Sequence, residues 1–164
     1  MAESGSNKLY LQWLNDAYSQ ELALIPTLEN HAKDMEKHSL DSSRMRQHIT
    51  ETERHAELLK ECINRLGGDV STLKVALGKT VGAILSAGSG IFSDEAIKNC
   101  LSDYAAEHME IASYTSLISA AEAAGDTQTA EVCRSILQDE TSMAEWLKNQ
   151  IPVVTKHMLQ DANS

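Results

Sequence analysis

The sequence predicts an all-α protein, and three observations support this fold class. Helix-favouring residues dominate the 164 residues, with only two prolines and eight glycines. No segment shows the alternation of apolar and polar residues that a β-strand requires. Apolar residues instead recur at spacings of three and four over long segments, which is the period of an amphipathic helix. We expect a single domain spanning residues 1–164, because this length is typical of one continuous apolar core.

The first half of the chain predicts a helical hairpin. An apolar stripe runs over residues 7–36, and Pro26 inside it is expected to kink the helix or force a bulge. This stripe consists of Tyr10, Trp13, Leu14, Ala17, Leu24, Ile25, Leu28, Ala32 and Met35. After a break at 37–39, a second stripe over 45–66 ends at Gly67-Gly68, which is a glycine stop typical of a helix C-terminus.

A long connection leads to the second half. Residues 67–92 join the two halves, and the small-residue stretch at 72–87 is expected to form a short helix. A connection of this length allows the next long helix to run parallel to the previous one. Ser93-Asp94-Glu95 predicts the start of that helix, with acidic residues in its first turn, and Gly125-Asp126 predicts its end.

The last long helix begins near Thr127 and meets Pro152. The tail from about residue 153 is expected to form a short terminal helix that frays. The four long helices therefore predict a four-helix bundle, built from two antiparallel hairpins that a long crossover joins.

Charge and composition exclude several classes of function. The 24 acidic and 14 basic residues give a net charge of −10, which disfavours nucleic acids and anionic membranes as partners. No apolar run reaches the roughly 18 residues of a membrane span, and the first thirty residues lack the pattern of a secretion signal. Cys62, Cys100 and Cys133 are widely spaced in apolar helical patterns, which suits reduced core thiols. We expect a soluble cytoplasmic protein.

Two carboxylates lie within the predicted apolar stripes. Glu21 lies four residues after Ala17 and three before Leu24, and Glu140 lies between Leu137 and Met143. Burial of an unpaired carboxylate is costly, so each group is expected to be protonated, paired or bound to a cation.

The spacing of the acidic residues indicates a metal centre. Glu51 follows Glu21 by thirty residues and Glu140 follows Glu110 by thirty, so each pair brackets a hairpin turn at one level of the bundle. Four carboxylates meeting in an apolar core require positive charge among them, and two divalent metal ions would supply it. Additional ligands near these acids are expected from His48, His55 and Glu107. Oxygen and imidazole ligands favour iron or manganese over structural zinc.

Four short segments carry a family resemblance. The chain resembles the ferritin-like superfamily, and within it the bacterial YciE/YciF family of stress proteins, over residues 9–147. The segments are Ala17-Tyr18-Ser19-Gln20-Glu21, His48-Ile49-Thr50-Glu51-Thr52, Glu107-His108-Met109-Glu110-Ile111-Ala112-Ser113-Tyr114 and Asp139-Glu140. The resemblance implies a dinuclear centre of two iron ions, a cytoplasmic setting and a link to the stress response.

The resemblance also assigns ligands, with one departure. The matching core carboxylates are Glu21, Glu51, Glu110 and Glu140, and Glu107 and a histidine of the second helix are implied as further ligands. The usual di-iron pattern carries Glu-x-x-His on two helices. Here Arg54 stands three residues after Glu51, and Met143 three after Glu140. The second half therefore lacks a histidine ligand, which leaves one metal with a shell of oxygen ligands or water unless Glu107 completes it.

Other side chains near these motifs have less specific predictions. His108 is expected to orient a carboxylate ligand. Tyr18 and Tyr114 flank the site by one turn, where packing is favoured over hydrogen bonding to a ligand or electron transfer. Three histidines are interpreted as surface residues and four methionines as core filler: His31, His38 and His157, and Met35, Met45, Met109 and Met143.

Two functional hypotheses follow. In the first, the protein binds Fe(II) in a di-metal site and reacts with oxygen or peroxide as a ferroxidase or peroxide scavenger. In the alternative, it is a non-catalytic helical module that forms a homodimer or docks a partner, with its acids protonated or bridged. A homodimer is expected in either case.

Overall fold

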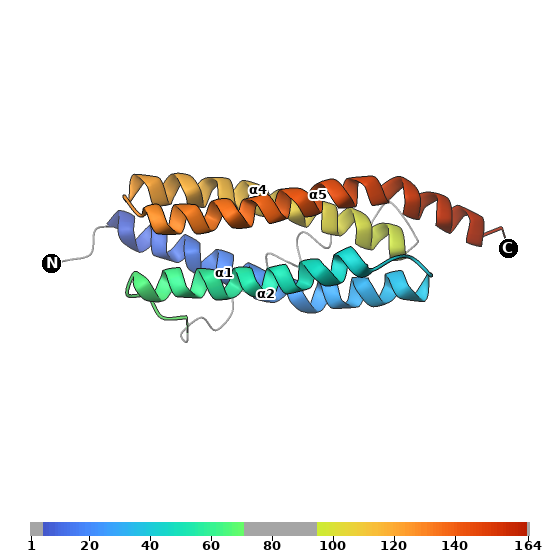
Figure 1. The fold of residues 1–164 in the computed structure, drawn as a ribbon, viewed down its shortest axis with the longest axis horizontal. Coiled ribbons are helices and arrows are strands. Elements are labelled where there is room, and N and C mark those ends of the chain that lie inside the picture. Colours follow the sequence, from blue (N-terminus) through green and yellow to red (C-terminus); the bar gives the residue numbers. More distant parts are fainter. Residues whose placement is uncertain (1–4, 71–94, 164) are drawn as a thin grey trace.

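The computed structural model describes residues 5–70 and 95–163, and these form an all-α four-helix bundle (Figure 1). The long helices are α1 (Gly5–Lys37), α2 (Ser43–Arg65), α4 (Glu95–Ala123) and α5 (Thr127–Asp161). The predicted fold class is confirmed. The expected short helix at 72–87 lies outside the described residues. In the described parts of the chain, no helix combines the length and apolar character that a bilayer span requires.

The two hairpins pack face to face. Helix α1 packs on α2 and α4 packs on α5, while α1 also contacts α4 and α2 contacts α5. Helices α2 and α4 run in the same direction along the bundle (Figure 1), as the long connection between them predicted. Each helix therefore presents one face to a common interior.

Both prolines lie inside continuous helices. Helix α1 runs through Pro26 without a break, and α5 runs through Pro152 to Asp161. The prediction of a separate, fraying terminal helix after residue 153 is therefore wrong. Val154 explains the difference, because it is 2% exposed and packs with Ala96 and Ile97 of α4 in a small apolar cluster.

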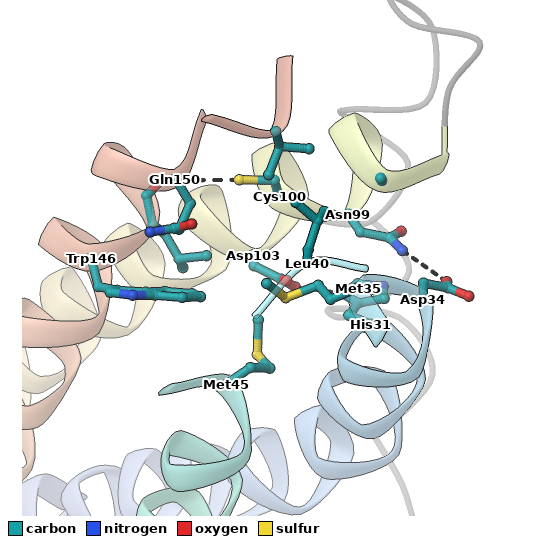
Figure 2. A pocket seen from close by; sticks show the side chains of 13 residues that line it. His31, Asp34, Met35, Leu40, Met45, Asn99, Cys100, Asp103, Trp146 and Gln150 are labelled. Carbon is teal, nitrogen blue, oxygen red and sulfur yellow. Dashed lines mark hydrogen bonds and ion pairs between the residues drawn. The ribbon is translucent and has the colours of Figure 1, made fainter. Parts of the chain in front are cut away.

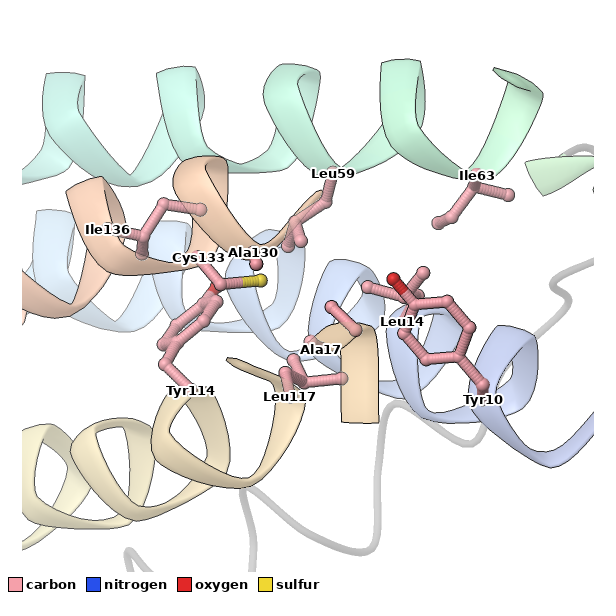
Figure 3. Close-up of a cluster of buried hydrophobic side chains, with 11 residues drawn as sticks. Tyr10, Leu14, Ala17, Leu59, Ile63, Tyr114, Leu117, Ala130, Cys133 and Ile136 are labelled. Carbon is pink, nitrogen blue, oxygen red and sulfur yellow. The ribbon is translucent and has the colours of Figure 1, made fainter. Parts of the chain in front are cut away.

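The apolar core has two main parts, one toward each end of the bundle. The first includes Leu14, Leu59, Tyr114, Cys133 and Ile136 (Figure 3). The second contains Leu24, Leu28, Met45, Ile49, Met143 and Leu147. Each of the four helices contributes residues to both clusters. Between these residues, each helix also carries buried polar side chains.

Some expectations about single side chains are confirmed and others are wrong. Cys62, Cys100 and Cys133 are buried free thiols, as expected. Trp13 and Met109 are not core residues, because they are 41% and 47% exposed. Met109 precedes the inward-facing Glu110, so helical geometry turns its side chain outward.

One polar cluster ties three helices together at the turn between α4 and α5. Asp126 caps α5 by accepting a hydrogen bond from the Thr129 backbone N–H at 3.2 Å. Its oxygens lie 2.5 and 2.7 Å from Nη2 of Arg65 on α2, and Tyr10 of α1 donates its hydroxyl to Oδ2 at 3.1 Å.

Replacing Asp126 with alanine is expected to lower the free energy of unfolding by about 2 kcal/mol. The change removes the helix cap and leaves the Arg65 guanidinium and the Tyr10 hydroxyl without this partner. Chemical denaturation of Asp126→Ala beside Glu131→Ala measures the effect. Glu131 has a 77% exposed side chain on the same helix, so its loss is expected to change little. Equal stability of the two variants would contradict this role of Asp126.

Candidate metal centre

Six ionisable side chains from four helices meet in the middle of the bundle. None of them is more than 3% exposed. They are Glu21 of α1, His48 and His55 of α2, Glu107 and Glu110 of α4, and Glu140 of α5. Each occupies an inward-facing position of its helix, as the burial of its side chain shows.

The first group of possible ligands joins α1, α2 and α5. Nδ1 of His55 lies 2.8 Å from Oε1 of Glu140 and 3.6 Å from Oε2 of Glu21. One ligand atom of each of the three residues lies within 4.8 Å of the others. This spacing allows all three to bind one ion.

The second group joins α2, α4 and α5. Nε2 of His48 lies 3.1 Å from Oε1 of Glu107 and 3.6 Å from Oε2 of Glu140. These three residues also have ligand atoms within 4.8 Å of one another. Glu140 therefore belongs to both groups and directs one oxygen toward each histidine.

Unpaired polar atoms show that these residues fit a pair of metal ions. Among the described residues, no well-aligned hydrogen bond reaches Oε2 of Glu21, Oε2 of Glu107, Nδ1 of His55 or either oxygen of Glu140, although Nδ1 of His55 lies only 2.8 Å from Oε1 of Glu140. Buried polar atoms are normally hydrogen-bonded, and a buried charge without compensation is strongly destabilising. Cations between the two histidines and the shared Glu140 would satisfy these same atoms.

Burial and mutual repulsion raise the pKa values of several acids here. Burial raises the pKa of Glu110 well above 4.5, and the charges of Glu21, Glu140 and Glu107 add to the shift. Burial also raises the pKa of Glu107 to about 8, although His48 opposes the shift. Without cations, therefore, protons take up part of the negative charge.

The histidines are the source of positive charge within the protein itself. Burial alone would lower the pKa of His48, but its bond with Glu107 and the charges of Glu107 and Glu140 raise it to about 9. Burial likewise opposes the charged form of His55, but Glu140 and Glu21 raise its pKa to about 10. Burial favours the neutral form of Glu140, yet its pKa is lowered by His55 and His48. The metal-free site is thus a network of shared protons.

Glu51 does not join the buried group. Its side chain is 18% exposed and accepts hydrogen bonds from Nη1 of Arg44 at 2.9 Å and Nε2 of Gln47 at 2.8 Å. Oε2 of Glu51 lies 3.2 Å from Nδ1 of His48, on the far side of the ring from Glu107. The expectation of four carboxylates from both hairpins at one level is met by Glu21, Glu110 and Glu140, but not by Glu51.

Asp139 contacts the outward-facing ring nitrogen of His55, just as Glu51 contacts that of His48. Oδ2 of Asp139 lies 3.1 Å from Nε2 of His55, while Nδ1 of that ring faces Glu140 and Glu21. Arg54 binds the same Asp139 oxygen from outside. Each buried histidine is therefore held by a partly exposed carboxylate, which in turn is held by an arginine. Such partners fix the orientation of a histidine ligand.

We expect Asp139→Asn to weaken one metal position selectively. The asparagine amide lacks the negative charge of Asp139, so its hydrogen bond with Nε2 of His55 is weaker. The His55 ring is then held less firmly toward Glu21 and Glu140. Loss of such a partner typically reduces metal affinity about 10- to 100-fold. A Co(II) titration followed by absorbance measures both binding steps. The matched variant Glu51→Gln is expected to weaken the His48 position instead, and equal weakening of both positions by either variant would contradict the pairing.

Comparison with known proteins places the chain in a family. The family model described as "Domain of unknown function (DUF892)" matches residues 6–160. The chain belongs to the DUF892 family. The DUF892 chain is similar to a protein from Xanthomonas campestris pv. campestris of known crystal structure, with 30% identity and a TM-score of 0.82. That match covers 98% of this chain and 100% of the other.

A second solved structure has a fold similar to that of this DUF892 protein. Desulfovibrio desulfuricans bacterioferritin, whose diiron site has been described in different catalytic states, matches with 21% identity and a TM-score of 0.72. The match covers 92% of this chain and 82% of the bacterioferritin. The ferritin-like four-helix bundle expected from the sequence is therefore confirmed.

The remaining predicted site residues of the DUF892 chain lie in different environments. Tyr114 packs in the apolar core and also donates its hydroxyl to Oε1 of Glu21. Tyr18 is half-buried and packs against the same cluster, as favoured. His108 is exposed and packs edge-to-face on Tyr104 with ring centroids 4.5 Å apart, so its place does not support a role in orienting a carboxylate.

Two histidines expected on the surface are involved in tertiary contacts. His31 is only 9% exposed, and its Nδ1 lies 2.7 Å from Oδ1 of Asp103 on α4. That expectation was wrong, because the compensating carboxylate lies 72 residues away in the sequence. His157 is half-buried and donates from Nε2 to the carbonyl oxygen of His38 at 2.7 Å, which holds the end of α5 against the turn after α1.

Proposed function

We propose that this protein binds two divalent metal ions in the middle of the bundle, iron foremost with manganese as the alternative. The observation that carries the proposal is the pair of histidine and carboxylate groups that share Glu140, with unpaired buried oxygens in both. Oxygen and imidazole donors suit iron and manganese. None of the three cysteines belongs to either group.

Each ion has its own histidine and its own carboxylate. Glu21 and His55 would hold one ion and Glu107 and His48 the other, with Glu140 between the two. Glu110 is buried beside them, and its pKa is raised by burial and by the nearby charges of Glu21, Glu140 and Glu107. It is therefore available as a further carboxylate for either ion.

The chemistry proposed for this centre is a reaction with dioxygen or peroxide. A pair of iron ions held by the two ligand groups would supply electrons to such an oxidant. The chain holds the ligands and excludes water: the Tyr114 hydroxyl fixes Glu21, and apolar residues flank the centre on both sides. Metal binding by these carboxylates would release the protons that Glu107 and Glu110 carry in the metal-free protein.

The motif resemblance supports a more specific role. We propose that the protein is a cytoplasmic stress-response protein of the YciE/YciF type, which removes Fe(II) and an oxidant together. The bacterioferritin of similar fold, with its diiron site, supports the choice of iron by analogy.

Anaerobic titration with Fe(II), followed by elemental analysis and then by mixing with aerated buffer, tests the proposal. Two equivalents of bound iron and a change in absorbance after mixing with oxygen are the expected results. Retention of two metal ions without a reaction would contradict the redox role alone, whereas no bound metal would contradict the whole proposal.

Exposed apolar residues on α1 favour a second candidate function. Leu9 and Trp13 are 45% and 41% exposed and lie one turn apart on the helix. They suit a non-catalytic module that forms a homodimer or docks a partner, with the buried acids protonated. In that case Glu110→Ala would stabilise the protein at neutral pH whether or not metal is added, because it removes a buried acid without removing a ligand.

A further inference from the structure

A small cavity lies between the four helices near the turn that joins α1 and α2 (Figure 2). Its volume is about 20 Å³. A cavity needs roughly 10 to 15 Å³ to hold one water molecule, so this one has room for only a very small molecule. Most of its walls are apolar and come from Met35, Leu40, Met45, Trp146, Leu147 and Val154.

Four of the polar side chains that line the cavity are paired with one another. Nδ1 of His31 lies 2.7 Å from Oδ1 of Asp103, and Nδ2 of Asn99 donates to Oδ2 of Asp34 at 3.0 Å (Figure 2). A buried water molecule needs two to four polar partners. Because these four groups already bond to each other, the Gln150 amide is the main polar group left for a water molecule, and the mostly apolar walls favour an apolar molecule.

Charge restricts the occupant further. Asp34 and Asp103 disfavour an anion at this point, as does the net charge of −10. A hydrated cation would lose its water against apolar walls, and His31 already compensates the charge of Asp103. The cavity therefore suits a small uncharged molecule.

The cavity also lies next to the candidate metal centre. Met45 precedes His48 by three residues on α2, and Asp103 precedes Glu107 by four residues on α4. At 1.5 Å of rise per residue, these separations are about 4.5 to 6 Å along the bundle. A molecule in the cavity is thus about one helical turn from the second group of ligands.

We propose that this cavity binds dioxygen and is the antechamber through which it reaches the metal centre. The inference rests on the proposed reaction with an oxidant and names dioxygen as the substrate. The half-buried Asp34 and Asn99 mark its outer side, and Met45 and Asp103 mark its inner side.

Binding can be tested on the metal-free protein, because dissolved dioxygen is paramagnetic and speeds the relaxation of nearby methyl protons. With methyl labels on methionine and isoleucine, the Met45 methyl group is expected to relax at least about twofold faster under oxygen than those of Ile63 and Ile136. All three side chains are at most 1% exposed, but the two isoleucines lie in the other apolar cluster. Met109, which is 47% exposed, gives the effect of dissolved oxygen in solvent. Equal enhancement at Met45 and the two isoleucines would overturn the proposal.

Filling the cavity tests its part in the reaction. Ala96 and Val154 line it, and Ala96→Leu or the milder Val154→Ile adds apolar volume there. The oxygen effect at Met45 is expected to fall to that at Ile136, and the Fe(II)-loaded protein to oxidise more slowly with its metal content unchanged. Loss of the oxygen effect without slower oxidation would overturn the antechamber role. If the wild-type protein binds no metal, the proposed function fails, and the methyl measurement still decides whether dioxygen occupies the cavity.

Discussion

Replacing Glu140 with alanine is expected to reduce the bound metal from two equivalents to almost none. Glu140 is the one residue shared by both ligand groups, and it directs an oxygen toward each histidine. Glu21→Ala and Glu107→Ala are each expected to remove only one equivalent, because each belongs to a single group. Elemental analysis of the purified variants after growth with iron and manganese measures the difference.

Glu145→Ala provides the matched control on the same helix. Its side chain is 61% exposed and pairs with Lys148 at 3.3 Å, so metal content is expected to stay at the wild-type value. If Glu140→Ala kept both ions while it remained folded, Glu140 would not be the bridging ligand. Thermal unfolding of the metal-free variant checks the fold independently.

The metal-free protein is expected to lose stability as the pH rises from about 5 to 9. Glu107 has a pKa of about 8 in the folded protein against a reference value of 4.5, and His48 and His55 have values of about 9 and 10 against 6.5. All three bind more protons folded than unfolded, so each contribution is lost as the pH rises through the folded pKa. Glu140, with a lowered pKa, acts in the opposite direction only as the pH falls below about 4.5.

The expected loss is several kcal/mol, since one pKa unit corresponds to about 1.4 kcal/mol and the coupled groups do not add independently. Urea denaturation in the presence of a chelator at pH 6, 7, 8 and 9 measures it. Bound metal is expected to remove the trend, because it takes the place of these protons. Stability that rises with pH over this interval in the metal-free protein would contradict the description of the site as a network of shared protons.

The helices could be predicted from local pattern, because the stripe of apolar residues needs no knowledge of distant partners. The same pattern located Glu21 and Glu140, since a carboxylate at an inward-facing position is conspicuous in sequence. The continuation of α5 beyond Pro152 was not predicted, because it depends on the packing of Val154 against α4.

The parts of the site that were not predicted depend on which hydrogen-bond partner each side chain takes. Glu51 has the right spacing from Glu21, but Arg44 and Gln47 on its own helix hold it at the edge. Arg44 stands seven residues before it, so the competing bond could have been inferred from helical spacing. The bond between Asp139 and His55 joins residues 84 apart, and no local signal reveals it.

A crystal structure of the iron-loaded protein, with anomalous diffraction recorded at the iron edge, tests the metal centre most directly. Two anomalous peaks are expected, one among Glu21, His55 and Glu140 and the other among His48, Glu107 and Glu140. A map without iron at these positions, in crystals of protein loaded with Fe(II), would contradict the assignment of these residues as a metal centre.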